Sequence, residues 1–379
     1  MLIKNVNIVF LDRIKKGSVT VSDSKIKGIN IESSDDNEII DGKGMYLAPG
    51  FIDIHIHGAG GSDTMDGTYL SINTISKTIL KHGTTSFVPT TMTCDILDIN
   101  KAVLSIKEAI EKGTDGAEVL GAHLEGPFVS PKMLGAQNPK YVKSPSIECF
   151  EKITGDNISL IKSVTLAPEI NGAEKLIKYL SSKNIVVSAG HSAASFNETM
   201  KSIEYGISHS THLYNVMTGF KHREPGVVGA VFDSDITTEL ICDGIHVSYP
   251  SIRIALKQKS TNNVILITDA MSACCMEDGL YSLGGQSVIV KNNTAMLKNG
   301  SLAGSVLTLD KSVKNLYENT NYKLNEIIKM VTYNPAKHCK VHNRKGIIKE
   351  GYDADLVLFD ENINIKMSVV NGEVKYVNI

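Results

Sequence analysis

The spacing of apolar and polar residues changes near residue 50. Before it, the two kinds alternate over short stretches that are broken by turn residues, at 2–10, 17–29 and 38–50. Such alternation is typical of half-buried β-strands. After it, short apolar runs are each followed by a polar turn and a segment with helical spacing, as at 97–112, 172–182 and 249–259.

The apolar runs after residue 50 are rich in Val, Ile and Leu, and they lie at 51–57, 85–90, 118–126, 160–168, 184–191, 207–215, 238–244 and 263–270. Eight continuous apolar strands separated by helices predict a closed parallel (β/α)₈ barrel. The competing fold is an open doubly wound sheet, but no GxGxxG follows the first strand to support a dinucleotide site.

The chain returns to strand-like patterns after the eighth run. A glycine-punctuated segment at 279–305 is followed by two helical segments that end near Asn334 and Pro335, and then by a strand-rich tail. We expect the two chain ends to form one small β-sandwich beside the barrel. The expected division is 1–49 and 342–379 for the small domain and 50–341 for the catalytic barrel.

The stretch GFIDIHIHG carries two histidines within an apolar strand. Side chains alternate between the faces of a strand, so His55 and His57 point the same way and Ile52, Ile54 and Ile56 point the other way. A pair of hydrogen-bonded histidines would explain this pattern, and so would a metal site with further ligands elsewhere in the chain.

Further reactive residues end other predicted strands. Barrel enzymes build their active sites at the carboxyl ends of the strands. Taken singly, each of these residues could equally be a cap or a turn residue. Together they predict a divalent-metal hydrolase, and donors without cysteine favour zinc or another first-row ion. The six residues are His55, His57, Glu125, His191, His212 and Asp269.

Composition narrows the class of protein. The 379 residues include 39 basic and 41 acidic ones, giving a formal net charge of -2. No general attraction to nucleic acid or to an anionic membrane is therefore expected. The start lacks the pattern of a signal peptide, and the six cysteines show no CxxC spacing, so we expect free thiols in the cytoplasm.

Two further residue types receive a structural interpretation. His82 precedes Gly83 and is expected at a helix C-terminus, where an imidazolium favours the helix dipole. Cys274 and Cys275 are expected to be soft core residues, because no neighbour in the sequence indicates a reactive thiolate.

Several motifs resemble those of the amidohydrolase superfamily, and in particular its amino-sugar-phosphate deacetylases. They are PGFIDIHIHG, HLEGPF, AGHS, THLYNVM, REPG, DGIHV, ITDAM, LAGS and GIIKEGYDADLVLFD. The similarity runs from about Gly42 to the C-terminus. It implies hydrolysis of the N-acetyl group of N-acetyl-D-glucosamine 6-phosphate, giving glucosamine 6-phosphate and acetate in amino-sugar breakdown.

The resemblance also implies roles for the six residues. Glu125, His191 and His212 would hold the main metal, and Asp269 would be the catalytic acid and base. His55 and His57 would serve a second metal that Glu125 bridges. One or two ions per chain are implied, zinc first and Fe²⁺, Mn²⁺ or Co²⁺ as alternatives.

Substrate contacts and assembly follow from the same resemblance. It implies a homodimer, in which the phosphate contacts come from the same chain or from the partner subunit, with a guanidinium suited to phosphate. Position 137 carries a neutral amide where some relatives have histidine, and Met133 and Leu134 stand where lysines are usual. The implied contact residues are Ala136, Gln137, Asn215, Val216, Arg223, His246, Leu302, Ala303 and Gly304.

Two other interpretations remain. The first is a different amidohydrolase, such as a cyclic-amide hydrolase, a deaminase or a deacetylase for the galactose-configured sugar. Cyclic amidases commonly bridge their metals with a modified lysine, whereas Glu125 would do so here. The second is a barrel that has lost its catalytic activity and serves as a scaffold protein. The sequence retains every residue that matches a metal ligand of the family, which argues against this interpretation.

Overall fold

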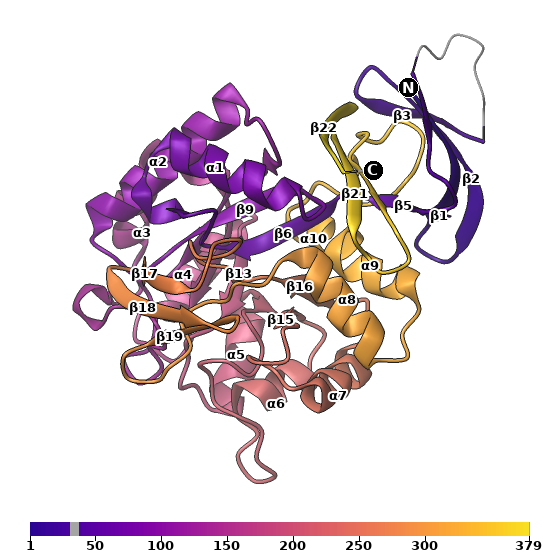
Figure 1. Ribbon diagram of the computed structural model, residues 1–379. Helices are drawn as coiled ribbons and strands as arrows, with labels where there is room; N and C mark the ends of the chain where they lie inside the picture. The colour runs from indigo at the N-terminus through magenta and orange to yellow at the C-terminus, as the bar shows by residue number, and fades with distance from the viewer. Residues whose placement is uncertain (31–37, 379) are drawn as a thin grey trace.

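The computed structural model describes residues 1–30 and 38–378, and its larger part is a nearly closed barrel of parallel strands (Figure 1). Each of the eight apolar runs overlaps a different one of the eight barrel strands, so the predicted (β/α)₈ barrel is confirmed. A short strand, β10 (Glu118–Val119), extends the pairing on β9. In chain order the barrel strands are β6 (Phe51–Ile56), β9 (Thr84–Thr91), β11 (Ala122–Glu125), β12 (Ile161–Leu166), β13 (Val186–Ala189), β14 (Ile207–Ser210), β15 (Thr237–Ile241) and β16 (Val264–Ile267).

The first and last barrel strands meet beside the HxH motif. The Asp269 amide donates to the His55 carbonyl at 2.9 Å, and the His57 amide donates to the Ala270 carbonyl at 2.8 Å. Asp53 adds a side-chain link, since the Thr268 hydroxyl donates to its Oδ2 at 2.6 Å. The strand ends that carry His55, His57 and Asp269 are therefore held together by the closure of the barrel itself.

Helices cover the outside of the barrel, and those expected at 97–112, 172–182 and 249–259 correspond to α2, α4 and α7. None of the helices in the described residues is both long and apolar enough to span a membrane. The α-helices are α1 (Tyr69–Leu80), α2 (Ile96–Lys112), α3 (Ile147–Thr154), α4 (Ala173–Ser182), α5 (Phe196–Tyr205), α6 (Gly226–Phe232), α7 (Tyr249–Lys259), α8 (Leu309–Asn319), α9 (Leu324–Val331) and α10 (Tyr333–His338), and the 3₁₀ turns are η1 (Thr64–Asp66), η2 (Pro139–Tyr141) and η3 (Gly155–Leu160).

The end of the helical region differs from the prediction. Two helical segments were expected to stop near Asn334 and Pro335, but α8 and α9 are followed by the short helix α10, which runs through Pro335. Pro335 lies in the first turn of α10, where a backbone N–H has no partner within the helix. The proline therefore begins a helix here and does not end one.

Both ends of the chain build the second, smaller sheet (Figure 1). Its order is β22-β21-β20-β5-β1-β2-β3, with β4 also paired to β1. Because β1 pairs with β2 and also with β4 and β5, hydrogen bonding is continuous and the expected β-sandwich is one sheet. The strands are β1 (Leu2–Val9), β2 (Ile14–Ser22), β3 (Lys25–Ile29), β4 (Ile39–Asp41), β5 (Tyr46–Pro49), β20 (Leu356–Phe359), β21 (Ile365–Val370) and β22 (Glu373–Val377).

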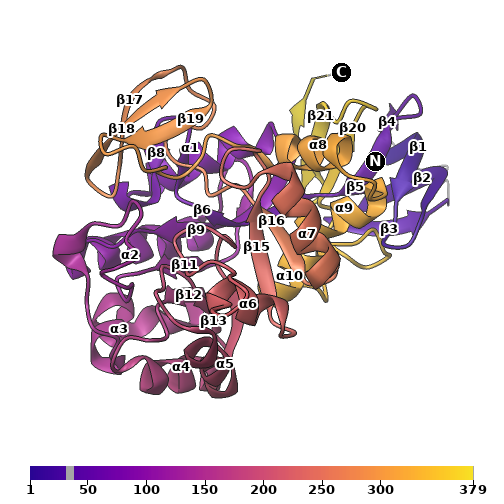
Figure 2. The ribbon, with the colours of Figure 1, turned by 90° about the horizontal axis from the view of Figure 1, so that it is seen from below.

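The glycine-punctuated segment forms a three-stranded sheet of β17 (Gly279–Leu283), β18 (Gln286–Lys291) and β19 (Thr294–Leu297). It lies across the molecule from the terminal sheet (Figure 2). Leu283 belongs to one buried cluster with Met92 and Met271, and Gln286 Nε2 donates to the Ala136 carbonyl at 2.6 Å. A two-residue ladder, β7 (Gly58–Ala59) with β8 (Ser62–Asp63), follows the first barrel strand. The insert is therefore attached to the rest of the molecule partly through Ala136, a residue expected to contact substrate.

Candidate active site and metal centre

The six reactive residues predicted at strand ends converge on one place. His55 lies in β6 and His57 directly follows it, Glu125 ends β11, His191 and His212 follow β13 and β14, and Asp269 follows β16. All six are buried, from His55 at 0% exposed to Asp269 at 8%. Six polar side chains withdrawn from water together need partners, which they find in one another.

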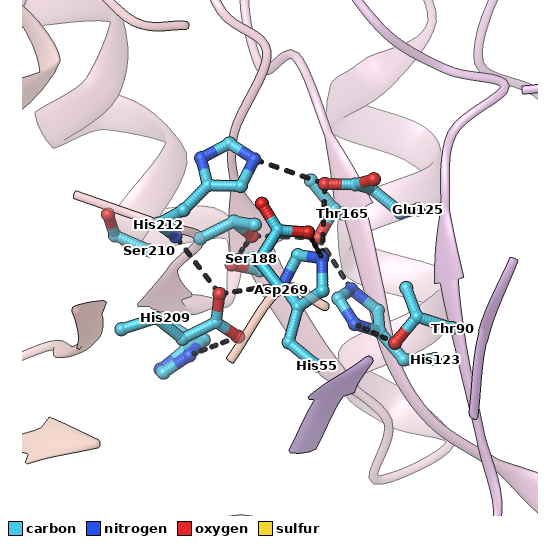
Figure 3. A network of polar contacts seen from close by, with 12 residues as sticks. His55, Thr90, His123, Glu125, Thr165, Ser188, His209, Ser210, His212 and Asp269 are labelled. Carbon is cyan, nitrogen blue, oxygen red and sulfur yellow. Dashed lines mark hydrogen bonds and ion pairs between the residues drawn. The ribbon is translucent and has the colours of Figure 1, made fainter. Parts of the chain in front are cut away.

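Glu125 is the centre of the first group of ligating atoms. Its Oε1 lies 3.2 Å from His191 Nε2 and 3.1 Å from His212 Nε2, the latter contact being visible in Figure 3. The two imidazole Nε2 atoms are 3.2 Å apart. One carboxylate oxygen and two imidazole nitrogens gathered this closely match a first-row divalent cation in donor type.

The HxH pair forms a second group of ligating atoms together with Glu125. His57 Nε2 lies 3.3 Å from Glu125 Oε2 and 3.2 Å from Asp269 Oδ1. His55 Nε2 lies 3.5 Å from Glu125 Oε1 and 3.4 Å from Asp269 Oδ1, yet it makes no hydrogen bond. A buried imidazole nitrogen without a hydrogen bond, aimed between two carboxylates, fits a metal ligand. The shared face predicted for His55 and His57 is confirmed.

Backbone conformation turns three of these side chains into the centre. His191, His212 and Asp269 have positive φ angles of 48°, 27° and 49°. Residues other than glycine adopt this left-handed region rarely and at a cost of about 1–3 kcal/mol each, which the surrounding structure must offset. The chain therefore reverses abruptly where each strand ends, and the side chain at the turn faces inward.

In three of the four histidines the other ring nitrogen, Nδ1, has a partner on the side away from the cluster, whereas His212 Nδ1 makes no hydrogen bond. His57 Nδ1 lies 3.2 Å from the Thr90 carbonyl oxygen, and His191 Nδ1 lies 3.2 Å from the Met133 carbonyl oxygen. His55 Nδ1 lies 2.9 Å from Glu239 Oε2. Such contacts select the tautomer that leaves Nε2 free to bind a cation, and they hold the ring in place.

Sequence reasoning missed Glu239, although it touches three members of the barrel interior. Besides His55, its carboxylate accepts the His212 backbone N–H at 3.0 Å and lies 3.3 Å from His209 Nε2. The signal available in the sequence was a charged residue within a predicted apolar strand. In the structure Glu239 lies in β15 and is 1% exposed. Asp53 was also missed, although it too is a charged residue within an apolar strand, β6. It is buried and accepts the Thr268 hydroxyl.

The carboxylates and imidazoles shift one another's pKa. Burial lowers the pKa of His55, but Glu239, Glu125 and Asp269 outweigh burial and raise it to about 9. Burial raises the pKa of Glu125, but His55 and His191 hold it well below the usual range. The cluster thus stabilises positive charge, and protons compete with a divalent cation for the same nitrogens.

A cavity opens over this cluster, and most of the expected substrate contacts line it. Arg223 does not: it is exposed and lines a neighbouring hollow with Lys221 and Glu224. Ala303 is buried between Leu302 and Gly304, which both reach the cavity wall. The expected residues that line the cavity are Ala136, Gln137, Asn215, Val216, His246, Leu302 and Gly304, and Met92 and Leu283 are additional ones.

Two of the lining residues have polar partners of their own. Gln137 Nε2 donates to Glu125 Oε2 at 2.7 Å, and its Oε1 accepts the Thr93 amide at 2.8 Å. His246 Nδ1 lies 2.6 Å from Asp243 Oδ2, which leaves Nε2 for a ligand. Gln137 therefore orients a cluster carboxylate in addition to lining the cavity.

His123 belongs to the barrel filling below the cluster (Figure 3). Its ring packs edge-on against His55 at 4.7 Å between centroids, and its Nε2 lies 2.7 Å from Thr165 Oγ1. Burial and the nearby His55 lower its pKa to about 3, so the ring is neutral. His123 thus fills the barrel and supports the ring of His55 by contact.

A parallel barrel with one carboxylate and four imidazoles gathered at its strand ends defines the class of metal-dependent hydrolases. Residues 46–375 match the model of the Amidohydrolase family, and the chain belongs to that family. Family membership and the histidine and carboxylate clusters together indicate a divalent metal.

The chain is similar over its length to known deacetylases. It is 39% identical to N-acetylglucosamine-6-phosphate deacetylase of Bacillus subtilis, covering 100% of this chain and 98% of the relative. It is 41% identical to that of Lysinibacillus sphaericus, covering 99% and 97%. The N-acetylgalactosamine-6-phosphate deacetylase of Escherichia coli O157:H7 is 35% identical, covering 86% and 87%.

Solved structures agree with these relatives. N-acetylglucosamine-6-phosphate deacetylase from Pasteurella multocida superposes with a TM-score of 0.94 at 33% identity, covering 100% of this chain and 99% of that one. A variant of the Mycobacterium smegmatis deacetylase in complex with N-acetyl-D-glucosamine-6-phosphate superposes with a TM-score of 0.93 at 25% identity, covering 100% and 99%.

Proposed function

We propose that this chain is a metal-dependent deacetylase that hydrolyses N-acetyl-D-glucosamine 6-phosphate to D-glucosamine 6-phosphate and acetate, in amino-sugar breakdown. The observation that carries the proposal is the buried group of Glu125, His191 and His212 within one cavity that also contains Asp269. The full-length similarity to deacetylases of this substrate supports it.

Glu125, His191 and His212 would hold the main cation, and His55 and His57 would hold a second one together with Glu125. We propose zinc, since imidazole and carboxylate donors without a thiolate suit it, with Fe²⁺, Mn²⁺ and Co²⁺ as alternatives. A divalent cation bound there supplies Lewis acidity toward water and toward the acetyl carbonyl oxygen.

Asp269 moves the proton. Its carboxylate accepts a proton from the water that adds to the acetyl carbon, and then delivers it to the sugar nitrogen as the C–N bond breaks. The contacts of Oδ1 with His55 and His57 support this role, because both histidines outweigh burial and lower the pKa of Asp269. The carboxylate is therefore ionised and able to act first as a base.

The cavity lining would bind the sugar. We assign this to Ala136, Gln137, Asn215, Val216, His246, Leu302, Ala303 and Gly304. His246 supplies Nε2 as a hydrogen-bonding group, since Asp243 occupies Nδ1 at 2.6 Å. Gln137 divides its amide between Glu125 and the Thr93 backbone, so substrate would meet a side chain that is already fixed.

We further propose a homodimer in which Arg223 binds the phosphate in the partner's cavity. Arg223 is exposed and outside the cavity of its own chain, as a residue acting across an interface would be. A planar guanidinium suits bidentate phosphate binding. We also propose a cytoplasmic location, which the six free cysteines support.

Acetate release from a panel of substrates tests the reaction. Protein purified without chelator is offered N-acetylglucosamine 6-phosphate, N-acetylgalactosamine 6-phosphate and unphosphorylated N-acetylglucosamine, and its metal content is measured by elemental analysis. We expect the highest kcat/KM on the first. A higher kcat/KM on the galactose-configured sugar would instead indicate an N-acetylgalactosamine-6-phosphate deacetylase. A protein without metal and without activity would indicate a scaffold.

A further inference from the structure

A second reactive cluster lies outside the catalytic cavity, at the junction of three distant segments. Cys275 Sγ lies 3.2 Å from His82 Nε2, and His82 Nδ1 lies 3.0 Å from Asp310 Oδ2. This corrects two sequence-based expectations. His82 follows the end of α1 and pairs with the side chains of Cys275 and Asp310, so its role is not limited to an interaction with the helix dipole. Cys275 is exposed and is not part of the core.

Each member of the cluster is held by the next. Asp310 lies in the first turn of α8, where its Oδ1 accepts the Lys311 amide at 2.8 Å and the Thr308 hydroxyl at 2.5 Å. Side-chain exposure rises outward, from 15% at Asp310 to 25% at His82, and Cys275 is exposed. A fixed acid, an oriented imidazole and an accessible thiol in series form the arrangement that activates nucleophiles.

The thiol of the adjacent residue, Cys274, also contacts Cys275. Cys274 Sγ is buried, lies 3.8 Å from Cys275 Sγ and donates to the Leu307 carbonyl at 3.3 Å. The contact with Cys275 and burial raise the pKa of Cys274 well above the usual range, so it stays protonated.

The Cys274 thiol and the nearby cations together favour the ionised form of Cys275. The Cys274 thiol lowers the pKa of Cys275 to about 5, opposed by burial and aided by His82 and Lys311. Burial lowers the pKa of His82, but contacts with Asp310 and Cys275 raise it to about 10. Near neutral pH the pair is a thiolate facing an imidazolium.

We propose that Cys275 is a thiol-modification site that forms mixed disulfides with low-molecular-weight disulfides. The thiolate attacks one sulfur of the reagent, so that a bond forms between Sγ and that sulfur while the reagent's S–S bond breaks. The second sulfur leaves with the electron pair as a thiolate. No other oxidant is needed, because the reagent is reduced as Cys275 is oxidised.

The adduct is reversible only by an external thiol. A bond to Cys274 would need a Cα separation of about 4.4–6.8 Å, whereas adjacent residues are about 3.8 Å apart. Cys274 is also buried and turned toward the Leu307 carbonyl. The mixed disulfide is therefore the end product until a small thiol releases it.

Cys94 and Cys149 serve as internal comparison sites. Both are partly exposed, and burial is the first cause that raises the pKa of each. At pH 6 a thiol of pKa about 5 is almost fully ionised, whereas a thiol with the usual pKa or a higher one is less than about 1% ionised. The weaker nucleophilicity of the more acidic thiolate reduces the advantage, leaving a rate about 10-fold higher for Cys275.

The test uses the metal-loaded enzyme and the neutral reagent bis(2-hydroxyethyl) disulfide. Peptide mapping by mass spectrometry gives the rate at each cysteine between pH 6 and pH 9. We expect Cys275 to react first at pH 6 with a rate nearly independent of pH, while the rates of Cys94 and Cys149 rise with pH. The fast reaction should vanish in Cys275→Ser, persist in Cys149→Ser and be reversed by dithiothreitol.

His82→Asn and His82→Gln separate activation from mere exposure. In both variants Cys275 should still be modified, but loss of the imidazolium should raise the pKa of Cys275 part of the way toward the usual range, so that its rate at pH 6 falls and increases with pH. Two results would overturn the proposal: equal rates for Cys275 and Cys149 at pH 6, or an unchanged pH profile in both folded His82 variants.

Discussion

Glu239 and His55 meet inside the barrel, with Glu239 Oε2 2.9 Å from His55 Nδ1. The same oxygen accepts the His212 backbone N–H at 3.0 Å, so one carboxylate supports residues from both ligating groups. Neither contact reaches the cavity, since Glu239 is not among the lining residues. Glu239 is therefore a positioning residue for the metal centre.

Glu239→Gln should lower metal affinity about 10- to 100-fold, the usual effect of losing a residue behind a metal ligand. The amide keeps the shape but removes the charge that selects the tautomer of His55. Competition with a chelator, followed by metal per chain, measures the loss. Glu111→Gln, on an exposed i,i+4 pair with Lys107, is the matched control and should change nothing. Equal affinities of the two variants would contradict the assignment.

Asp269→Asn should lower kcat at least ~100-fold, because the amide cannot accept the proton from water. Metal content should stay near that of the wild type, since Glu125, His191 and His212 remain. Steady-state kinetics and elemental analysis on the same preparation check both statements. Near-normal kcat would remove Asp269 from the proton transfer, and loss of all metal would make it a ligand instead.

His55→Ala should reduce metal content from two ions per chain to one, and activity should fall with it. The unpartnered Nε2 of His55 between Glu125 and Asp269 motivates this expectation. Elemental analysis of protein purified without chelator is the measurement, with His342→Ala as a control on a histidine outside the cluster. A single ion in wild type and variant, with equal activity, would mean that the HxH pair has no second metal to hold.

The barrel could be predicted because each strand is buried on both faces and therefore appears as a continuous apolar run. The positions of Glu125, His191, His212 and Asp269 at the ends of such runs then predicted their convergence, since the ends of parallel strands meet at one rim. The same rule could not predict where Arg223 lies relative to the cavity. Arg223 is in a loop, and the path of a loop depends on tertiary contacts that the local pattern of apolar and polar residues does not show.

The sequence carries no local signal of which residues closure of the fold brings together. Glu239 is 184 positions from His55, and Cys275 is 193 positions from His82. In sequence, Glu239 is one charge within an apolar strand and Cys275 is one of two adjacent cysteines. Only the three-dimensional arrangement shows that each faces a histidine, which is why both roles escaped sequence reasoning.

Arg223→Ala should reduce kcat/KM for the phosphorylated sugar far more than for the unphosphorylated one, because only the former offers an anion to the guanidinium. Lys221→Ala, on the same exposed loop, is the matched control. Equal losses on both sugars would exclude a phosphate contact.

Mixed dimers test whether Arg223 acts across the interface. When Arg223→Ala and Asp269→Asn chains are co-expressed, a site with an intact Asp269 can receive Arg223 from the other chain. Activity should then return to about a quarter of the wild-type level, since half the dimers are mixed and each has one complete site. No recovery above the sum of the parent variants would place the contact within one chain.

Lys345 joins the barrel to the terminal sheet through buried charge. It is 2% exposed, its Nζ lies 2.6 Å from Glu118 of β10, and it contacts Asp355, which directly precedes β20. Glu118 and Asp353 each also pair with Arg344, so both would still have a cation without Lys345. Asp355 pairs with no other cation within the described residues. Removing Lys345 therefore leaves one buried carboxylate without its counter-charge.

Lys345→Met should destabilise the fold by about 3 kcal/mol, the cost of breaking one side of a buried ion pair. The midpoint of urea unfolding measures this, with Lys178→Met, from an exposed pair with Glu174, as a control that should change little. Because the penalty arises from the stranded charge, adding Asp355→Asn to Lys345→Met should restore part of the stability. If the double variant is no more stable than the single one, the loss comes from packing and not from charge.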